Sequence, residues 1–244
     1  MLHQIESMKA PFIAFTVVLG IWELAAIFSN LEAHVFPGPL QVVLSFRELI
    51  LDGTLIRHSI ASLFRVTAGF YLAIIFGIPL GILIGRISIA HELLNPLIQF
   101  LRPISPLAWI PLAMLWFGIG DAPAIFLIFL ASFFTLVVST VVAVHSIDQT
   151  YFYVAANFNF TTWEIVHKII VPAIIPDIIT ALRISISIAW LVVVAAEMIA
   201  VQSGLGYLIL DARNALRMDY VMVSMIMIGL IGMLLDFMMR KIQS

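Results

Sequence analysis

The chain has 244 residues, of which 63% are hydrophobic and 11% are charged, with a formal net charge of −2 and a mean hydropathy of +1.14. A soluble globular domain is about 45–50% apolar and about 25% charged, so a water-soluble core of this size cannot hide this apolar excess. The composition excludes intrinsic disorder and disfavours a soluble enzyme. The continuous apolar runs disfavour an outer-membrane barrel, whose strands alternate. We expect a helical integral membrane protein.

Two further counts limit the chemistry of the chain. It contains no cysteine, so disulfide, thiolate and iron–sulfur chemistry are absent. Its six histidines are scattered rather than clustered with ligand spacing, so no metal site is predicted and a membrane-embedded enzyme is disfavoured. The charge balance gives no basic patch, and no nucleic-acid partner is expected.

Apolar runs recur along the whole chain. A helix needs roughly 20 apolar residues to cross the bilayer core. The sequence therefore predicts a single all-α transmembrane domain over residues 1–244 with about six spans, at 11–28, 62–85, 95–118, 122–145, 176–200 and 220–239. A polar excursion at 148–172 separates the fourth and fifth of these spans.

The second predicted span carries Gly77, Gly81 and Gly85, spaced four residues apart on one helix face. Small residues at this spacing let two helix backbones approach closely in lipid. We favour packing within one subunit over a dimer interface. Pro79 lies among these glycines and predicts a kink.

The third predicted span is interrupted by prolines within residues 103–111. Broken backbone at membrane depth lines a cavity or is buried in protein. With a positive charge beside the break, the segment predicts a wet translocation path that includes Arg102, Ser105 and Trp109. A kinked packing helix with Arg102 reaching towards the interface is an equally good interpretation.

The fifth predicted span carries two charges, Arg183 and Glu197, which are fourteen residues apart. They are about 21 Å apart along one helix and within about 40° of the same face, so they cannot pair with each other. Intramembrane charges face a bundle interior or a cavity. The helix therefore either lines the translocation path or forms ion pairs with other helices, and both interpretations stay open.

The excursion at 148–172 predicts two short helices joined by a sharp turn. Thr161 and Glu164 have capping-box spacing. Asn159 precedes them and tolerates the left-handed conformation that a sharp turn needs. We expect the second helix to end before Pro172. Such a hairpin at the membrane surface is suited to docking a partner, whereas a lid over the chain's own helices is disfavoured because its charged residues need water.

The same excursion resembles a known loop. The stretch Tyr153 to Asn159, followed by Trp163, Ile165 and Val171-Pro172, resembles the EAA loop of ABC-importer membrane subunits. That pattern runs Glu-Ala-Ala, three residues, Gly, nine residues, Ile, one residue and Leu-Pro. Tyr153 stands at the Glu position, which removes one implied polar contact with the ATPase. Asn159 stands at the Gly position, where Asn preserves the turn.

Other segments resemble permeases for nitrate, sulfonate, taurine or bicarbonate. The resemblance runs from about Ile21 to the C-terminus and is specific for the family but not for the substrate. The segments are Ser62–Val66, Gly69-Phe70, Gly77–Gly81, Pro106–Pro111, Leu115–Gly118, Ala195–Met198 and Gly204–Tyr207.

The resemblance implies a type I ABC-importer (MetI-like) permease fold with cytoplasmic coupling helices, in the bacterial inner (plasma) membrane with both termini cytoplasmic. It implies a homodimer with a second copy, two ATP-binding ABC subunits, a periplasmic or lipid-anchored substrate-binding protein and surrounding membrane lipid. The implied function is ATP-driven import of a small anion (nitrate, sulfonate/taurine or bicarbonate) by alternating access. A thiamine-precursor-like small molecule is the alternative substrate.

The chain is expected to be a non-catalytic subunit. It has no Gly-x-x-x-x-Gly-Lys-Ser/Thr motif for nucleotide phosphates. ATP and Mg are therefore expected to be used by the partner ATPase, with no cofactor bound by this chain. A secondary transporter or channel working without an ATPase would share the six spans but would need no docking loop.

Three groups of residues are the candidate sites. The ATPase-coupling group is Tyr153, Val154, Ala155, Asn159, Thr161, Trp163, Glu164 and Lys168. The translocation-pathway group is Arg102, Ser105, Trp109, Arg183 and Glu197. The group expected to dock the binding protein is Gly204, Arg213 and Arg217.

Overall fold

A computed structural model describes residues 2–29 and 35–243, with side chains from residue 13 onward except residue 15. Every regular element in these ranges is a helix, which confirms the all-α prediction. In chain order they are α1 (Leu2–Phe28), α2 (Pro39–Leu51), α3 (Thr54–Arg86), α4 (Ser88–Leu101), the 3₁₀-helix η1 (Pro106–Trp109), α5 (Ile110–Phe117), α6 (Asp121–His145), α7 (Gln149–Asn157), α8 (Thr162–Ile165), the π-helix η2 (Val166–Ile170), α9 (Val171–Ala200), α10 (Leu205–Asn214) and α11 (Met218–Gln243).

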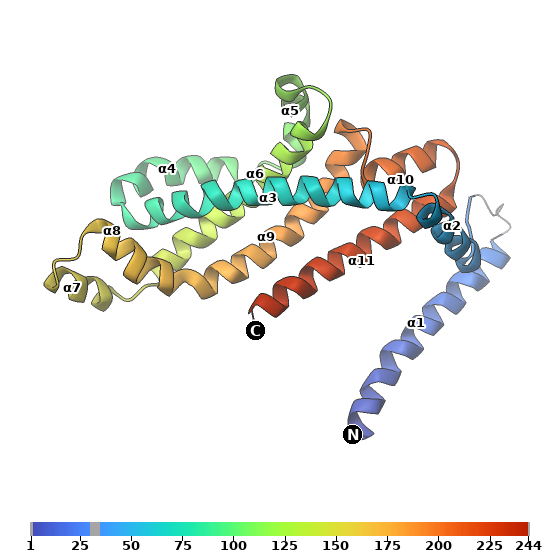
Figure 1. The fold of residues 1–244 in the computed structure, drawn as a ribbon, viewed down its shortest axis with the longest axis horizontal. Coiled ribbons are helices and arrows are strands. Elements are labelled where there is room, and N and C mark those ends of the chain that lie inside the picture. The colour runs from blue at the N-terminus through green and yellow to red at the C-terminus, as the bar shows by residue number, and fades with distance from the viewer. Residues whose placement is uncertain (1, 30–34, 244) are drawn as a thin grey trace.

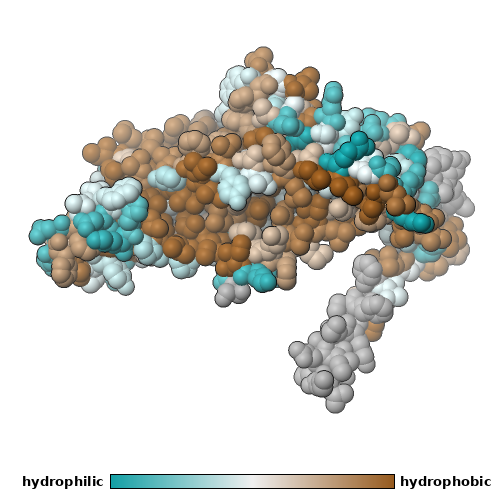
Figure 2. Space-filling model, viewed as in Figure 1, coloured by the Kyte–Doolittle hydropathy of each residue, from teal (hydrophilic) through white to brown (hydrophobic). Residues whose placement is uncertain are grey.

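The long helices α3, α6 and α9 run along the length of the molecule and form its body (Figure 1). The short helices α7 and α8 lie at one end, and α2 and α10 lie at the other. Hydrophobic residues cover the middle of the visible face, while hydrophilic residues gather near both ends (Figure 2). This distribution is that of a body crossing a membrane with its two ends in water.

Within residues 2–29 and 35–243, four helical stretches are long and apolar enough to cross a membrane, namely α3, α6, Thr162–Ala200 and α11. A fifth crossing results if the bent pair formed by α4 and residues 106–117 counts as one span. The apolar part of α1, Thr16–Phe28, is shorter than these. The predicted first span at 11–28 is therefore helical, and its crossing of the membrane stays a prediction.

The predicted span at 95–118 is not one helix. Its two halves, α4 and the η1–α5 segment, meet at 87°. Pro103 lies in the break and Pro106 begins η1, and neither has an amide donor. Ser105, which precedes Pro106, has a non-helical backbone with ψ of 131°. The sequence predicted an interruption here but not a change of direction of this size.

The glycine stripe of α3 packs against α6 within the same subunit, as the sequence analysis favoured. A Cβ atom added to Gly81 would lie 2.5 Å from Cβ of Thr140, and one added to Gly85 would lie 2.7 Å from Cβ of Val144. The two helix backbones therefore approach so closely that only glycine fits at these positions.

Gly81→Val is expected to destabilise the subunit by about 1–3 kcal/mol, because the added side chain overpacks a closed helix–helix contact. Gly229→Val in α11 is the matched control, since nothing lies within 4 Å of a Cβ at that position. Thermal unfolding of the purified subunit in detergent measures the difference. Equal unfolding temperatures for the two variants would show that α3 and α6 are not as closely packed at Gly81 as the structure indicates.

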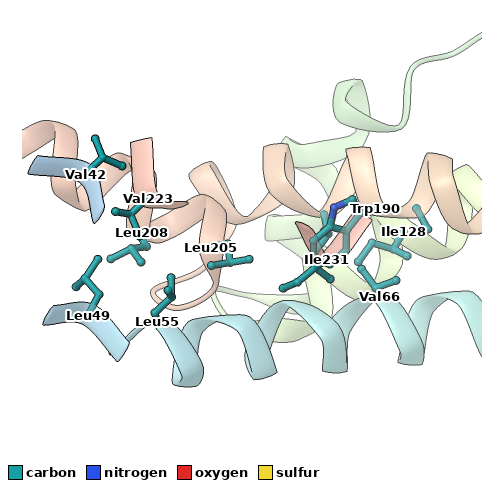
Figure 3. Packing of buried hydrophobic residues seen from close by; sticks show 12 residues of the cluster. Val42, Leu49, Leu55, Val66, Ile128, Trp190, Leu205, Leu208, Val223 and Ile231 are labelled. Carbon is teal, nitrogen blue, oxygen red and sulfur yellow. The ribbon is translucent and has the colours of Figure 1, made fainter. Parts of the chain in front are cut away.

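A hydrophobic cluster holds the end with α2 and α10 together. Leu49 of α2, Leu55 of α3, Leu208 of α10 and Val223 of α11 are all buried in it (Figure 3). Farther along the same cluster, the indole nitrogen of Trp190 donates to the Ile228 carbonyl at 3.0 Å. The helices that surround the loop after α9 are thus fixed to one another.

Candidate functional site

The excursion between α6 and α9 begins with a capped helix. The Asp148 side chain accepts a hydrogen bond from the Thr150 amide at 2.8 Å, at the N-terminus of α7. This hydrogen bond lowers the pKa of the Asp148 carboxyl below its ordinary value. The carboxylate therefore stays ionised at neutral pH. Its negative charge then also interacts favourably with the positive end of the dipole of α7.

Asn159 makes the predicted turn, with a positive φ of 53°. The Phe160 amide donates to the Ala155 carbonyl and the Asn159 amide to the Ala156 carbonyl, both at 3.0 Å. These two bonds form a Schellman motif, in which a left-handed residue ends a helix. Asn159 thus sets the angle at which the chain leaves α7.

The capping box is also confirmed. The Glu164 amide donates to Oγ1 of Thr161 at 3.3 Å, and the Thr161 amide donates to Oε2 of Glu164 at 3.0 Å. Nζ of Lys168 lies 2.8 Å from Oε1 of Glu164, one turn farther along. Local polar contacts therefore fix the start of the second helix.

The prediction that this second helix ends before Pro172 is wrong. It continues through η2 into α9 without a gap. Pro172 stands in the first turn of α9, and the preceding turn is a π-helix, in which the hydrogen-bond register shifts. The proline is accommodated at this change of register, so the hairpin is continuous with a long helix.

One face of the hairpin packs on the chain's own helices. Ala155 is 1% exposed, and Phe152 and Ile165 pack on a cluster formed by α6 and α9. Ala155, a member of the predicted coupling group, therefore supports the hairpin from within and does not lie on its exposed face.

The opposite face of the hairpin is exposed and aromatic. Tyr153 is 69% exposed, and Phe158 and Trp163 are each 71% exposed. The Trp163 ring packs against the His167 ring at a tilt, with ring centres 3.7 Å apart. The Lys168 ammonium lies 4.8 Å from the centre of the Phe160 ring. Large apolar side chains gathered among charges at one end of a membrane protein are typical of a protein–protein contact.

Two of the predicted pathway residues line one cavity. Arg102 and Trp109 border a cavity of about 190 Å³ between the α4–η1 break and α6, where Thr135 also contributes. Ser105 is exposed at the start of η1 and is not among the residues that line the cavity. The break thus places the Arg102 guanidinium beside a cavity that α6 also lines.

The other two predicted pathway residues form ion pairs with neighbouring helices, the alternative that the sequence analysis left open. Nε of Arg183 lies 2.8 Å from Oδ1 of Asp236 in α11. Glu197 is fully buried, and its Oε1 lies 2.6 Å from Nη1 of Arg65 in α3.

Arg65 is the centre of a network that sequence reasoning missed. This residue is 1% exposed, and its guanidinium also reaches Oδ1 of Asp121 at 2.8 Å and the carbonyl of Ser203 at 2.8 Å. It donates a second hydrogen bond to Ser203, at the hydroxyl. One buried cation therefore joins α3, α6, α9 and the loop that follows α9.

The Glu197 carboxylate is fully satisfied in this network. Its Oε2 accepts hydrogen bonds from the Ser62 hydroxyl at 2.9 Å and from the Gly206 amide at 3.0 Å. The Ser62 oxygen in turn accepts from the Leu205 amide at 2.9 Å. The start of α10 is thus tied to both α3 and α9.

His58 completes the attachment one turn away. Its Nδ1 lies 2.9 Å from the Gly204 amide nitrogen, and its ring stacks with Tyr207. His58, Ser62 and Arg65 follow helical spacing along one face of α3. A stripe of polar residues on one face of an apolar helix indicates a buried polar partner, and this is the sequence signal from which the network could have been predicted.

The structure corrects the predicted docking group. Gly204 is buried, with a positive φ of 103° and Glu197 directly against the position of a Cβ, so it forms a turn rather than a contact surface. Arg217 is held by Asp219 at 2.8 Å and lies 3.8 Å over the Tyr220 ring. Arg213 is exposed at the end of α10.

The chain matches a family model described as "Binding-protein-dependent transport system inner membrane component" over residues 77–244. The chain belongs to this family. It is a multi-pass ABC permease subunit, the non-catalytic membrane component of an importer.

Individual relatives agree over almost the whole chain. A protein of Methanocaldococcus jannaschii named as an ABC transporter permease is 41% identical over 97% of this chain and 89% of its own length. A nitrate import permease of Leptolyngbya laminosa is 38% identical, covering 95% and 85% of the two chains. The taurine transport system permease of Escherichia coli is 34% identical, covering 93% and 84%.

A solved structure confirms the MetI-like fold of this permease. An inward-facing MetNI methionine ABC transporter matches with a TM-score of 0.68 and 17% identity, covering 79% of this chain and 96% of that chain. At this identity the likeness concerns the fold alone.

Proposed function

We propose that the hairpin of α7 and α8 docks an ATP-binding subunit and transmits its movement to the membrane helices. The observation that carries this proposal is the construction of the hairpin. Local caps and the Asn159 turn make it rigid, its inner face is fixed to α6 and α9, and its aromatic outer face is exposed. Because η2 and α9 continue the second helix, displacement of the hairpin moves a helix of 30 residues.

This proposal places the α7–α8 end in the cytoplasm and the α10 end outside. The helix α11 begins beside α10, and α1 ends near α2 at the same end of the molecule (Figure 1). Both termini therefore point away from the outer end, in support of cytoplasmic termini in a bacterial inner membrane.

The assembly that we propose contains two copies of this permease, two ATP-binding subunits and a periplasmic or lipid-anchored binding protein. The ATP-binding subunits bind Mg and hydrolyse ATP, and in this proposal the permease chain binds no cofactor. The binding protein meets the α10 end, where Arg213 is exposed. One docking hairpin per permease chain supports two copies of this chain, one for each ATP-binding subunit.

The cargo that we propose is a small anion such as nitrate, taurine, another sulfonate or bicarbonate. The relatives named for nitrate and taurine support this class. Arg102 at its cavity supplies a transient favourable potential for such an ion.

Arg102→Gln is expected to reduce anion uptake several-fold while complex assembly stays intact, because the variant removes the charge at the cavity but not the fold. Arg57→Gln, at the outer end of α3, is the control with the same loss of charge. Uptake of labelled nitrate and taurine into proteoliposomes measures the effect. Unchanged uptake with Arg102→Gln would assign this residue a structural role.

The docking proposal can be tested by cross-linking, since the chain contains no cysteine. Phe158→Cys is expected to form cross-links to the ATP-binding subunit in the assembled complex. Arg213→Cys, at the other end of the molecule, is expected to form none. Cross-linking from Arg213→Cys, or from neither variant, would contradict the proposed docking.

A further inference from the structure

The helix α4 carries a polar arc that leads to Arg102, and the other residues of the arc are not in the predicted pathway group. His91, Asn95 and Gln99 are spaced four residues apart, and Arg102 follows. At about 100° per residue these four positions fall within about 80° of the helix circumference. The opposite face presents exposed apolar residues, namely Leu93, Leu97 and Phe100.

The polar arc borders a cavity of about 200 Å³ between α4 and α6. His91, Asn95 and Gln99 line one side, and His145 at the end of α6 lines the other. One water molecule occupies about 30 Å³ in the liquid, so the cavity has room for a small ion with several waters. Polar side chains at membrane depth face such cavities rather than lipid.

One of the two histidines of this cavity has an unused hydrogen-bond donor or acceptor. Their ring centres are 5.3 Å apart. Nδ1 of His91 is buried and has no hydrogen-bond partner in the part of the chain that the structure describes. A buried polar atom without a partner is destabilising, which favours a polar occupant beside it.

This cavity and the Arg102 cavity border successive parts of α6. The α6 residues that line the Arg102 cavity lie between Leu130 and Thr135, and those that line this one lie between Val137 and His145. Among the described residues that line either cavity there is no Asp or Glu. Glu92 is the nearest carboxylate on α4 and is exposed beside the arc. Beside aliphatic side chains of α3, α4 and α6, the lining of this cavity offers the amides of Asn95 and Gln99 and two imidazoles, while Arg102 borders the other cavity. These groups can donate hydrogen bonds to an oxyanion.

We propose that the cavity lined by His91, Asn95, Gln99 and His145 is an inner oxyanion subsite, which receives the anion from the Arg102 cavity and passes it to the cytoplasmic end. This inference rests on the proposed function, since it needs the chain to import an anion. Amide and imidazole donors bind more weakly than a guanidinium, so the anion can leave inwards.

The test uses single cysteines in the assembled transporter in proteoliposomes. Asn95→Cys and Gln99→Cys are placed in the subsite, and Leu93→Cys on the apolar face of α4 is the control. The complex is treated with anionic and cationic thiosulfonate reagents, with and without nitrate or taurine. The subsite cysteines are expected to react, more rapidly with the anionic reagent, and the transported anion is expected to slow the reaction several-fold. Leu93→Cys is expected to react slowly and without protection.

Two results would overturn the proposal. One is a subsite cysteine that reacts no faster than Leu93→Cys, and the other is a reaction that the transported anion does not slow. Uptake by the wild-type complex is measured in the same vesicles. Absence of any anion uptake would overturn the proposed function and the subsite together, whereas normal uptake without protection would overturn the subsite alone.

Asn95→Leu supplies a second readout. It is expected to raise the nitrate or taurine concentration for half-maximal uptake several-fold, with the yield of the complex unchanged. A changed yield with an unchanged half-maximal concentration would assign Asn95 a packing role and contradict the subsite.

Discussion

Arg65→Ala is expected to destabilise the subunit by about 3–5 kcal/mol, because it leaves the fully buried Glu197 carboxylate without its cation. Arg57→Ala, two turns earlier on α3 and exposed, is the control and is expected to change stability by less than about 0.5 kcal/mol. Thermal unfolding in detergent and the yield of the assembled complex measure both variants. Equal stability of the two would show that Glu197 needs no partner.

The double variant Arg65→Ala with Glu197→Ala separates the ion pair from simple loss of packing. When both charges are removed, no buried charge is left unpaired, so the double variant is expected to be more stable than the sum of the single losses predicts. Strictly additive losses would contradict a direct interaction between the two side chains.

The ion pair also links the two ends of the transporter. The helix α9 starts at the docking hairpin and carries Glu197 near its other end, where Arg65 and Ser62 hold it. The loop that follows is fastened by the same side chains. A displacement of the hairpin is therefore opposed, or passed on, at the opposite end of the molecule, where α10 begins.

Asn159→Val is expected to bring ATP-dependent uptake close to background. A β-branched residue is strongly disfavoured at the positive φ of 53° found here, so the hairpin loses the turn that sets its angle. Asn159→Gly is the matched control, because glycine adopts this conformation without strain. Uptake and ATP hydrolysis are measured on the same vesicles.

The Asn159 variants also separate loss of assembly from loss of coupling. If Asn159→Val assembles and hydrolyses ATP without uptake, the turn is needed to convert hydrolysis into movement. Normal uptake and normal complex yield in Asn159→Val would contradict the assignment of this loop to coupling.

The hairpin was predictable from sequence because its determinants are local. The Thr161–Glu164 box and the turn at Asn159 each depend on residues within one or two helical turns, so their spacing alone predicts the geometry. The end of the second helix was misjudged because Pro172 stops a helix only where an amide donor is required, and the π-turn before it relaxes that requirement.

The charged residues inside the spans were less predictable because their partners are distant in sequence. Arg65 and Glu197 are 132 residues apart, and no local pattern connects them. The helical repeat predicted Arg183 and Glu197 within about 40° of one face but could not indicate which residues pair with them. Gly204 was misread for the same reason, since its turn is shaped by the buried carboxylate beside it.

The bend in the third predicted span shows a partial success. Prolines near Arg102 predicted broken backbone, and the 87° change of direction follows from the same residues. The position of the cavity depends on α6, which packs there only in the folded subunit.

The most direct test of the account is uptake into proteoliposomes that contain this permease, its ATP-binding subunit and its binding protein. We predict that labelled nitrate, taurine, another sulfonate or bicarbonate accumulates only when ATP is supplied and all three components are present. Accumulation driven by an ion gradient in vesicles that contain this chain without the ATP-binding subunit would contradict the account.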